Sequence, residues 1–222
     1  MASNPLRLGD RAPNFSLPAV NRDGQVSLED YGGRSPVLLG LFRGLHCPFC
    51  RRQLVQLGTT QEKLKAMGVE TVAVVNTPLE RARLYFKYRP ARVLLAADPE
   101  AATHRAFGVP AGVLVENESE ASWSLGKVTM TQLLATRVNP TGELPAPQNV
   151  FAAMEALNQR DAFEPNEVDQ QIAATHGLQL AGHFLMDREG IIRWLQIEGA
   201  EGINDLLKLP SEEQILAAAR GL

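Results

Sequence analysis

The chain has 222 residues, of which 45% are hydrophobic and 21% charged, and its formal net charge is −3. These totals are typical of a globular protein long enough to bury one full core. A slightly acidic chain without a basic stripe gives no support to nucleic-acid binding. The N-terminus lacks the charged-then-apolar layout of a secretory signal, and no apolar run approaches the roughly 18–20 residues that a membrane helix needs. We therefore expect a cytoplasmic protein without a membrane or nucleic-acid partner.

The first elements expected along the chain are a hairpin, a helical turn and a buried strand. The turn at residues 21–24 separates two short strands, and residues 27–31 predict a helical turn that ends at Gly32. Residues 37–42 are apolar without alternation. Such a strand is typically buried on both faces, as in a parallel sheet.

Strands and helices then alternate. The predicted elements are a helix that begins at the dithiol, with Pro48 in its first turn, and ends before Gly68, strands at 69–75 and 93–96, a helix at 77–87 and a short helix at 98–107. For the second of these helices, Thr77 is the predicted N-cap, with Pro78 at the first helical position and Glu80 at the third. The alternation implies a parallel sheet with right-handed crossovers.

Residues 111–180 interrupt this order and are predicted to be a helical insertion. Two helices are expected within it, at 149–160 and 165–175, with Phe151 and Leu157 on one face of the first. After the insertion we expect an antiparallel hairpin at 183–197, which makes the central sheet mixed, and two C-terminal helices, the last capped by Ser211. The whole chain, residues 1–222, is predicted to be a single domain.

The only two cysteines, Cys47 and Cys50, form a C-x-x-C pair between a predicted strand and a predicted helix. A thiolate at a helix N-terminus faces unpaired N–H groups and the positive end of the helix dipole, which favour the charged form. This chemistry assigns an exposed Cys47 as the nucleophile and a more buried Cys50 as the residue that resolves the mixed disulfide. The ring that the pair closes is too small for an effective structural staple.

Three other roles for the pair are weaker. Zinc would need two further ligands, and the four histidines of the chain include no H-x₃₋₅-H pair. A c-type haem would need histidine directly after Cys50, where Arg51 stands. Two buried structural thiols are the remaining alternative. We predict redox chemistry with no bound metal or cofactor, since the chain also lacks a G-x-G-x-x-G nucleotide fingerprint.

Five segments of the chain occur in the order seen in the peroxiredoxin superfamily. They are APNFSL at 12–17, LEDY at 28–31, CPFC at 47–50, the stretch from Asp98 to Val109, and FLMDREG at 184–190. The chain therefore resembles the alkyl hydroperoxide reductase/thiol-specific antioxidant (AhpC/TSA) group, in the branch that carries C-x-x-C. The resemblance covers about residues 6–110 and 180–222, and it implies a thioredoxin-like three-layer α/β/α sandwich.

The chain also departs from that family. Gly40 and Gly44 stand where the peroxiredoxin signature has proline and threonine, and Ala181 stands where its arginine would fall. Ala181 also occupies the place of the cis-proline of thioredoxin-like oxidoreductases. The groups that polarise a peroxide in the family are therefore absent from their usual positions.

Four residues are candidates for stabilising the thiolate or orienting a substrate: Arg43, His46, Arg51 and His183. The first three flank the dithiol in sequence, and a nearby cation favours a thiolate and attracts anions. His183 lies next to the position of the cis-proline. The alternative for each is a solvated or purely structural role. His104 and His176 are expected at the surface, and Trp123 is expected to be a packing residue.

We predict a thiol–disulfide oxidoreductase of peroxiredoxin-like type, an antioxidant enzyme that reduces peroxides or disulfides through Cys47 and Cys50. The resulting disulfide would be reduced by thioredoxin, glutaredoxin or glutathione. Two alternatives stay open, a protein disulfide reductase without peroxidase activity and a redox-sensing interaction module. The sequence also leaves open whether the chain forms a homodimer.

Overall fold

The computed structural model describes residues 5–222, so residues 1–4 of the predicted domain lie outside the described part. The first half contains β1 (Ser16–Pro18), β2 (Gln25–Ser27), β3 (Val37–Phe42), α1 (Pro48–Ala66), β4 (Glu70–Val75), α2 (Leu79–Tyr88), β5 (Leu94–Ala97) and α3 (Ala102–Ala106). The second half contains β6 (Val113–Val115), β7 (Lys127–Thr129), α4 (Met130–Ala135), β8 (Arg137–Val138), β9 (Gln148–Asn149), α5 (Val150–Arg160), α6 (Glu167–His176), β10 (Gly182–Met186), β11 (Ile192–Ile197) and α7 (Glu212–Ala219).

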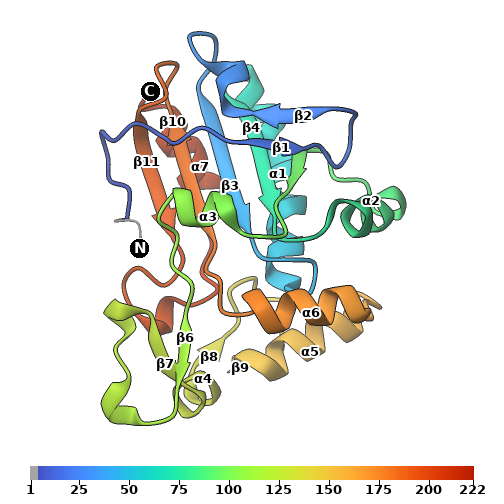
Figure 1. Ribbon diagram of the computed structural model, residues 1–222, viewed down its shortest axis with the longest axis vertical. Helices are drawn as coiled ribbons and strands as arrows, with labels where there is room; N and C mark the ends of the chain where they lie inside the picture. The colour runs from blue at the N-terminus through green and yellow to red at the C-terminus, as the bar shows by residue number, and fades with distance from the viewer. Residues whose placement is uncertain (1–4) are drawn as a thin grey trace.

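A mixed sheet with the strand order β11-β10-β3-β4-β5 forms the centre of the molecule. β3, β4 and β5 are parallel, as the alternating pattern predicted, whereas β10 is antiparallel to both of its neighbours. Every residue of β3 is buried, because both faces of the sheet are covered. In Figure 1, α3 and the β1–β2 hairpin lie in front of the sheet, and α1 and α7 lie behind it. The predicted three-layer α/β/α architecture is confirmed.

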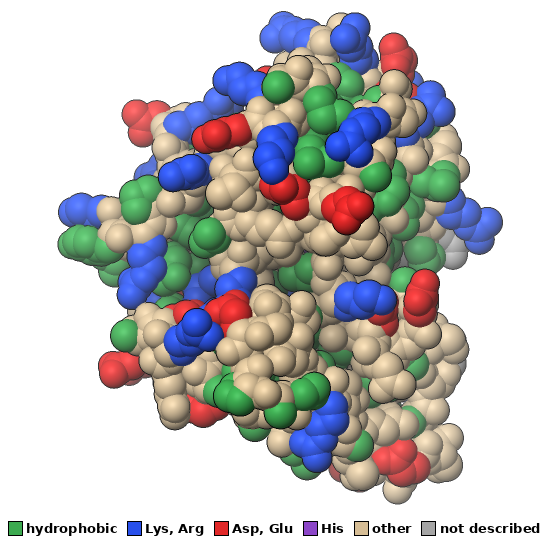
Figure 2. Space-filling model, turned by 180° about the vertical axis from the view of Figure 1, so that it is seen from behind, with side chains coloured by type: hydrophobic (Ala, Val, Ile, Leu, Met, Phe, Trp, Pro, Cys, Tyr) green, Lys and Arg blue, Asp and Glu red, His purple; other side chains and the backbone are tan. Residues whose placement is uncertain are grey.

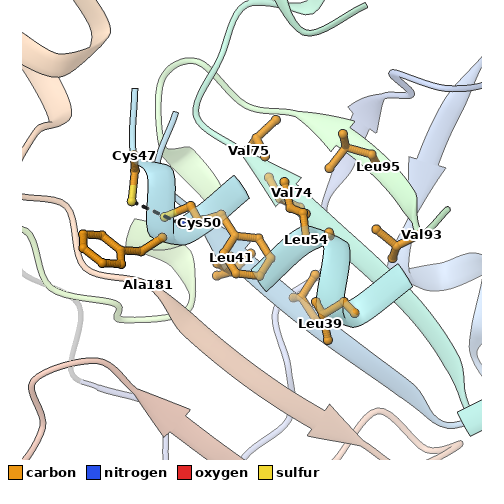
Figure 3. Packing of buried hydrophobic residues seen from close by; sticks show 14 of the residues in the cluster. Leu39, Leu41, Cys47, Cys50, Leu54, Val74, Val75, Val93, Leu95 and Ala181 are labelled. Carbon is orange, nitrogen blue, oxygen red and sulfur yellow. Dashed lines mark hydrogen bonds between the residues drawn. The ribbon is translucent and has the colours of Figure 1, made fainter. Parts of the chain in front are cut away.

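The core runs continuously from the sheet to the dithiol. Leu39, Leu41 and Val74 of the sheet pack with Leu54 of α1 in one buried cluster that also includes both cysteines. Figure 3 shows the cysteines at one end of this packing, side by side at the start of α1. The dithiol is therefore an extension of the core rather than a surface feature.

The elements from β6 to α6 lie together at the lower end of the molecule in Figure 1, below the end of β3 and the start of α1. The helices α5 and α6 confirm the two predicted in this segment. The prediction missed α4 and two small strand pairs, β6–β7 and β8–β9. We propose that residues 111–180 are an insertion into a single domain.

Four predictions of local structure are wrong. Thr77 does not cap α2, whose N-cap is Pro78; its hydroxyl instead accepts a hydrogen bond from the Leu45 N–H at 3.2 Å. Phe151 is 43% exposed, and Val150 and Ala153 are buried with Leu157 on the inner face of α5. The first of the two expected C-terminal helices is only a 3₁₀ turn at Ile203–Asp205. His104 is fully buried rather than at the surface.

No helix within residues 5–222 is both long enough and apolar enough to cross a membrane.

Candidate active site

The dithiol sits where a buried strand gives way to a helix. Cys47 is the N-cap of α1, with extended backbone angles of φ −86° and ψ 106°, and Pro48 occupies the first turn without an N–H to satisfy. The Cys47 sulfur accepts a hydrogen bond from the Cys50 backbone N–H at 3.3 Å, shown as the dashed line in Figure 3. The sulfur thus takes the place of the hydroxyl or carboxylate that caps most helices, where negative charge is favoured.

Both cysteines are free thiols in this structure, and each is only 1% exposed. The expectation that Cys47 is exposed and Cys50 more buried is therefore wrong. Residues 37–42 form the predicted strand buried on both faces, and the loop after it is buried as well. A reagent must displace part of the surrounding protein, or be small, to reach either sulfur.

Arg43 follows β3 directly and brings a positive charge to the dithiol. Its Nη1 lies 3.6 Å from the Cys47 sulfur and 3.9 Å from the Cys50 sulfur. The side chain is buried, so its charge is poorly screened by water. Arg43 is the one residue among the sequence-based candidates with a described hydrogen bond to the sulfurs of the dithiol.

Glu198, which is absent from the sequence-based candidates, is the partner of Arg43. The Arg43 Nη2 donates to both carboxylate oxygens, at 2.5 and 2.6 Å, and Glu198 is almost completely buried. Glu198 also accepts hydrogen bonds from the backbone N–H groups of Ala181 and Leu207. The available signal in the sequence was a carboxylate directly after β11, next to a glycine.

The two thiols have very different proton affinities. Burial raises the pKa of Cys47, but the hydrogen bond with the Cys50 thiol, the charge of Arg43 and the Cys50 N–H together lower that pKa to about 6. Burial and the neighbouring Cys47 sulfur raise the pKa of Cys50 well above its ordinary value. For Arg43, Glu198 and the sulfurs outweigh the effect of burial and raise the pKa. Of the two thiols, Cys47 is therefore the one that loses its proton first, and Cys50 keeps its proton.

The predicted histidines are buried and neutral. Burial and the charge of Arg43 lower the pKa of His46 to about 4, and burial lowers the pKa of His183 to about 3. Neither ring nitrogen of His46 has a hydrogen-bond partner among the described residues. His183 packs edge-on against Phe42, with ring centroids 5.2 Å apart. Neither side chain supplies a positive charge to the thiolate at neutral pH.

Arg51 points away from the sulfurs and toward the predicted insertion. Its guanidinium donates to the Leu45 carbonyl, to Asn158 and to Asp161, and it stacks 4.0 Å from the centre of the Phe163 ring. The next residue, Arg52, binds Asp161 and Glu143. Both arginines thus join α1 to the insertion.

These arginines line a cavity of about 950 Å³ along α1. Neither Cys47 nor Cys50 is among the residues that line this cavity. Figure 2 shows the back of the molecule, where basic and acidic side chains meet between its upper and lower parts.

The positions at which the chain departs from the peroxiredoxin signature are closely packed. A Cβ at Gly44 would lie 2.7 Å from the Asn76 carbonyl oxygen and 2.8 Å from Ile172. A Cβ at Gly40 would lie 2.7 Å from the Phe42 ring. Ala181 instead uses its backbone N–H to bind Glu198. The space that larger side chains would need at Gly40 and Gly44 is therefore already filled, and Arg43 is the residue that brings a positive charge to the sulfurs.

Among the described residues, no group of three or more His, Cys, Asp or Glu side chains is arranged to hold a metal ion.

A buried thiolate at the start of the helix that follows the central strand, with a second thiol one turn further on, defines a thiol-dependent oxidoreductase of thioredoxin-like fold. Residues 7–125, just over half of the chain, match the family described as Redoxin. The chain belongs to this family.

Peroxiredoxin Bcp of Escherichia coli K12 is 32% identical to this chain over 107 residues, which cover 48% of this chain and 67% of that protein. The protein is thus a peroxiredoxin-like thiol-dependent oxidoreductase.

Solved structures agree in fold. The reduced 2-Cys peroxiredoxin of Plasmodium vivax matches with a TM-score of 0.58 at 15% identity, covering 97% of this chain and 81% of that chain. Peroxidoxin BcpB of Mycobacterium tuberculosis matches with a TM-score of 0.56 at 12% identity, covering 98% of each chain. A putative thiol:disulfide interchange protein DsbE of Chlorobium tepidum matches with a TM-score of 0.53 at 24% identity, covering 96% of this chain and 99% of that chain. At these identities the likeness concerns the fold alone.

Proposed function

We propose that Cys47 and Cys50 carry out a dithiol–disulfide cycle with a small peroxide as the oxidising substrate. The Cys47 thiolate attacks one peroxide oxygen, the O–O bond breaks, and the other oxygen leaves as water or an alcohol after taking up a proton. Cys47 is left as a sulfenic acid. The Cys50 sulfur then attacks the Cys47 sulfur, a disulfide forms and water leaves. An external thiol donor returns two electrons and two protons to the pair.

The observation that carries this proposal is the lowered pKa of Cys47, about 6, beside Arg43 and a protonated Cys50. The thiolate is the reactive form, so the attacking group is present at neutral pH. Below pH 6 the thiolate fraction falls about tenfold per pH unit, because each unit of pH changes the ratio of the two forms tenfold. The rate of the first oxidation should fall in the same proportion.

The burial of both sulfurs favours a small substrate over a protein disulfide. With 1% exposure at each cysteine, a sulfur of another protein cannot approach Cys47 without movement of the loops around it. A peroxide molecule needs far less room. The second candidate, a protein disulfide reductase without peroxidase activity, would require that movement for its substrate as well as for a protein reductant.

The reductant, the cellular site and the assembly are further proposals. The chain offers no nucleotide fingerprint, which supports a thiol donor such as thioredoxin, glutaredoxin or glutathione. An antioxidant role in the cytoplasm is consistent with a reactive dithiol that must be returned to its reduced form. The homodimer stays a prediction.

The reaction of the reduced protein with stoichiometric hydrogen peroxide tests the proposed function. Wild-type protein should lose two thiols and gain a Cys47–Cys50 disulfide at a rate well above that of a free thiol. Cys50→Ser should stop at a Cys47 sulfenic acid, and Cys47→Ser should not react. Rapid-mixing fluorescence and mass spectrometry measure these steps.

A peroxide rate no higher than that of free cysteine would contradict a peroxidase. Turnover in an insulin-reduction assay would then favour the disulfide reductase, and no turnover in either assay would favour a redox-sensing module. If Cys50→Ser lost the first oxidation and Cys47→Ser kept it, the roles of the two cysteines would be reversed.

A further inference from the structure

Glu198 is the buried carboxylate in direct contact with the charge system of the dithiol, and both of its oxygens are fully bonded. They accept four hydrogen bonds: two from Arg43, at 2.5 and 2.6 Å, one from the Ala181 N–H at 2.8 Å and one from the Leu207 N–H at 2.7 Å. Buried carboxylates with this many donors are held in one orientation. Glu198 is therefore a fixed point in the site.

Glu198 binds one side of the Arg43 guanidinium and leaves the other side facing the sulfurs. Nη2 is taken by both oxygens of Glu198, and Nη1 is directed at the sulfurs of Cys47 and Cys50. A planar guanidinium bound on one side cannot rotate freely, so the direction of its other N–H groups is set by its partner. The position of Nη1 against the sulfurs is thus determined by Glu198.

The charge of Glu198 by itself works against the thiolate. A second negative charge close by raises the pKa of Cys47, and Glu198 has this effect in the structure. If Glu198 contributed only its charge, the pKa of Cys47 would be lower without Glu198. For Glu198 to favour the thiolate, its hold on the orientation of Arg43 must outweigh this repulsion.

We propose that Glu198 is a positioning residue for the thiol chemistry of Cys47, acting through Arg43. This inference rests on the proposed function of the dithiol and adds a residue to it. The backbone contributes as well: Leu207, which binds Glu198, has a positive φ of 65°, a conformation that non-glycine residues adopt at a cost. The turn around Leu207 is held in that conformation while its N–H points at the carboxylate.

The variant Glu198→Gln distinguishes position from charge by the direction of one shift. Its amide keeps the shape of the carboxylate but cannot accept both Nη2 contacts and both backbone N–H groups, so Arg43 should lose its orientation. We expect the midpoint of the pH profile for alkylation of Cys47 by iodoacetamide to rise, with a rate at pH 5 lower by about tenfold for each unit of midpoint shift. Mass spectrometry at Cys47 separates its alkylation from that of Cys50.

A lowered midpoint would show that Glu198 acts only as a charge and would overturn the proposal. An unchanged midpoint with a lowered melting temperature would show a purely structural role and would also overturn it. The alkylation profile needs no peroxide turnover. A failure of the proposed peroxidase activity is therefore seen separately, as a slow peroxide reaction in wild-type protein with a normal thiol profile.

Glu198→Gln leaves the buried charge of Arg43 without a partner, and this can prevent folding. In that case a second variant keeps the test decisive. Glu198→Asp keeps the buried ion pair and should fold. Its side chain is one methylene shorter, so the carboxylate withdraws from Arg43 while the charge stays the same. The midpoint should therefore rise above the wild-type value, by less than in Glu198→Gln where that variant folds. An unchanged or lowered midpoint in Glu198→Asp would overturn the proposal.

Discussion

At the scale of single residues, the site is shaped by glycines as much as by charged groups. The Asn76 carbonyl, the His46 ring and Ile172 all approach Gly44 so closely that a Cβ there would lie only 2.7 to 3.0 Å from them. Side chains of threonine size have no room at this position. The departure from the peroxiredoxin signature is therefore built into the packing around the dithiol, and Arg43 supplies the positive charge from the neighbouring position.

The variant Gly44→Ala tests this packing. A methyl group closer than 3.0 Å to the Asn76 backbone oxygen must push the loop or α6 aside. Overpacking of this kind costs about 1–3 kcal/mol of the free energy of unfolding, measured by urea denaturation. The matched control is Gly32→Ala, because its nearest neighbour would be 3.5 Å away and its φ of −53° suits alanine. Equal stability of the two variants would contradict the tight packing of Gly44.

At the scale of elements, local patterns predicted most of the fold. The apolar run of β3 and the alternation of strands and helices predicted the parallel part of the sheet, and the capping box of Ser211 predicted the start of α7. The capping box from Thr129 to Gln132 carried the same kind of signal for α4, a helix that was not predicted.

Predictions failed where a side chain binds a partner far away in the sequence instead of a local one. Thr77 had the right spacing for an N-cap, but its hydroxyl binds Leu45, 32 residues earlier in the chain. The pairing of Arg43 with Glu198 joins residues 155 positions apart. Only the register of β10 between β3 and β11 brings them together, and no local pattern encodes that register. His104 was misplaced because burial of a polar residue depends on tertiary packing.

Trp123 links the insertion to the end of β11. Its indole N–H donates to the Gly199 carbonyl, and its ring lies where a side chain at position 199 would be. Trp123→Phe should lower the free energy of unfolding by about 1 kcal/mol, the usual contribution of one hydrogen bond. Trp123→Ala should lower it by about 2–3 kcal/mol, because the partly buried ring loses fewer contacts than a core tryptophan. Urea titrations followed by circular dichroism measure both changes.

The shape of those transitions tests the proposal of a single domain. One domain should unfold in a single transition in wild type and in both variants. The two variants should have a lower midpoint urea concentration than wild type and the same dependence of the unfolding free energy on urea. A separate early transition in Trp123→Ala would show that the insertion unfolds by itself. A Trp123→Phe variant as stable as wild type would show that the hydrogen bond to Gly199 contributes nothing.

At the scale of the whole molecule, the insertion covers the dithiol end of the sheet (Figure 1). Ile172 of α6 packs at Gly44, Arg51 binds Asp161 beyond α5, and Arg81 of α2 binds Asp169 of α6 at 2.6 Å. The first two contacts join the insertion to the loop and helix that carry the cysteines, and the third joins it to α2. We therefore predict that residues far from Cys47 in sequence control access to it.

Weakening the attachment of α6 should increase the access of large reagents to Cys47 more than that of small ones. In Arg81→Gln, Asp169 keeps its burial, with a side chain only 1% exposed, but loses its ion-pair partner, so α6 should detach more often. We expect the rate of Cys47 with a bulky dipyridyl disulfide to rise about tenfold, while the rate with hydrogen peroxide changes by less than about twofold. An opening that costs about 1.4 kcal/mol less is populated tenfold more.

The control is Arg92→Gln, which removes an exposed pair with Glu62 at 3.8 Å and should leave both rates unchanged. Stopped-flow absorbance follows the disulfide reagent, and the pH profile of Cys47 in Arg81→Gln shows whether the thiolate itself has been altered. Equal acceleration with both reagents would mean that the variant changes the reactivity of the sulfur rather than its cover. No acceleration with either reagent would mean that substrates reach Cys47 by a route that does not pass α6.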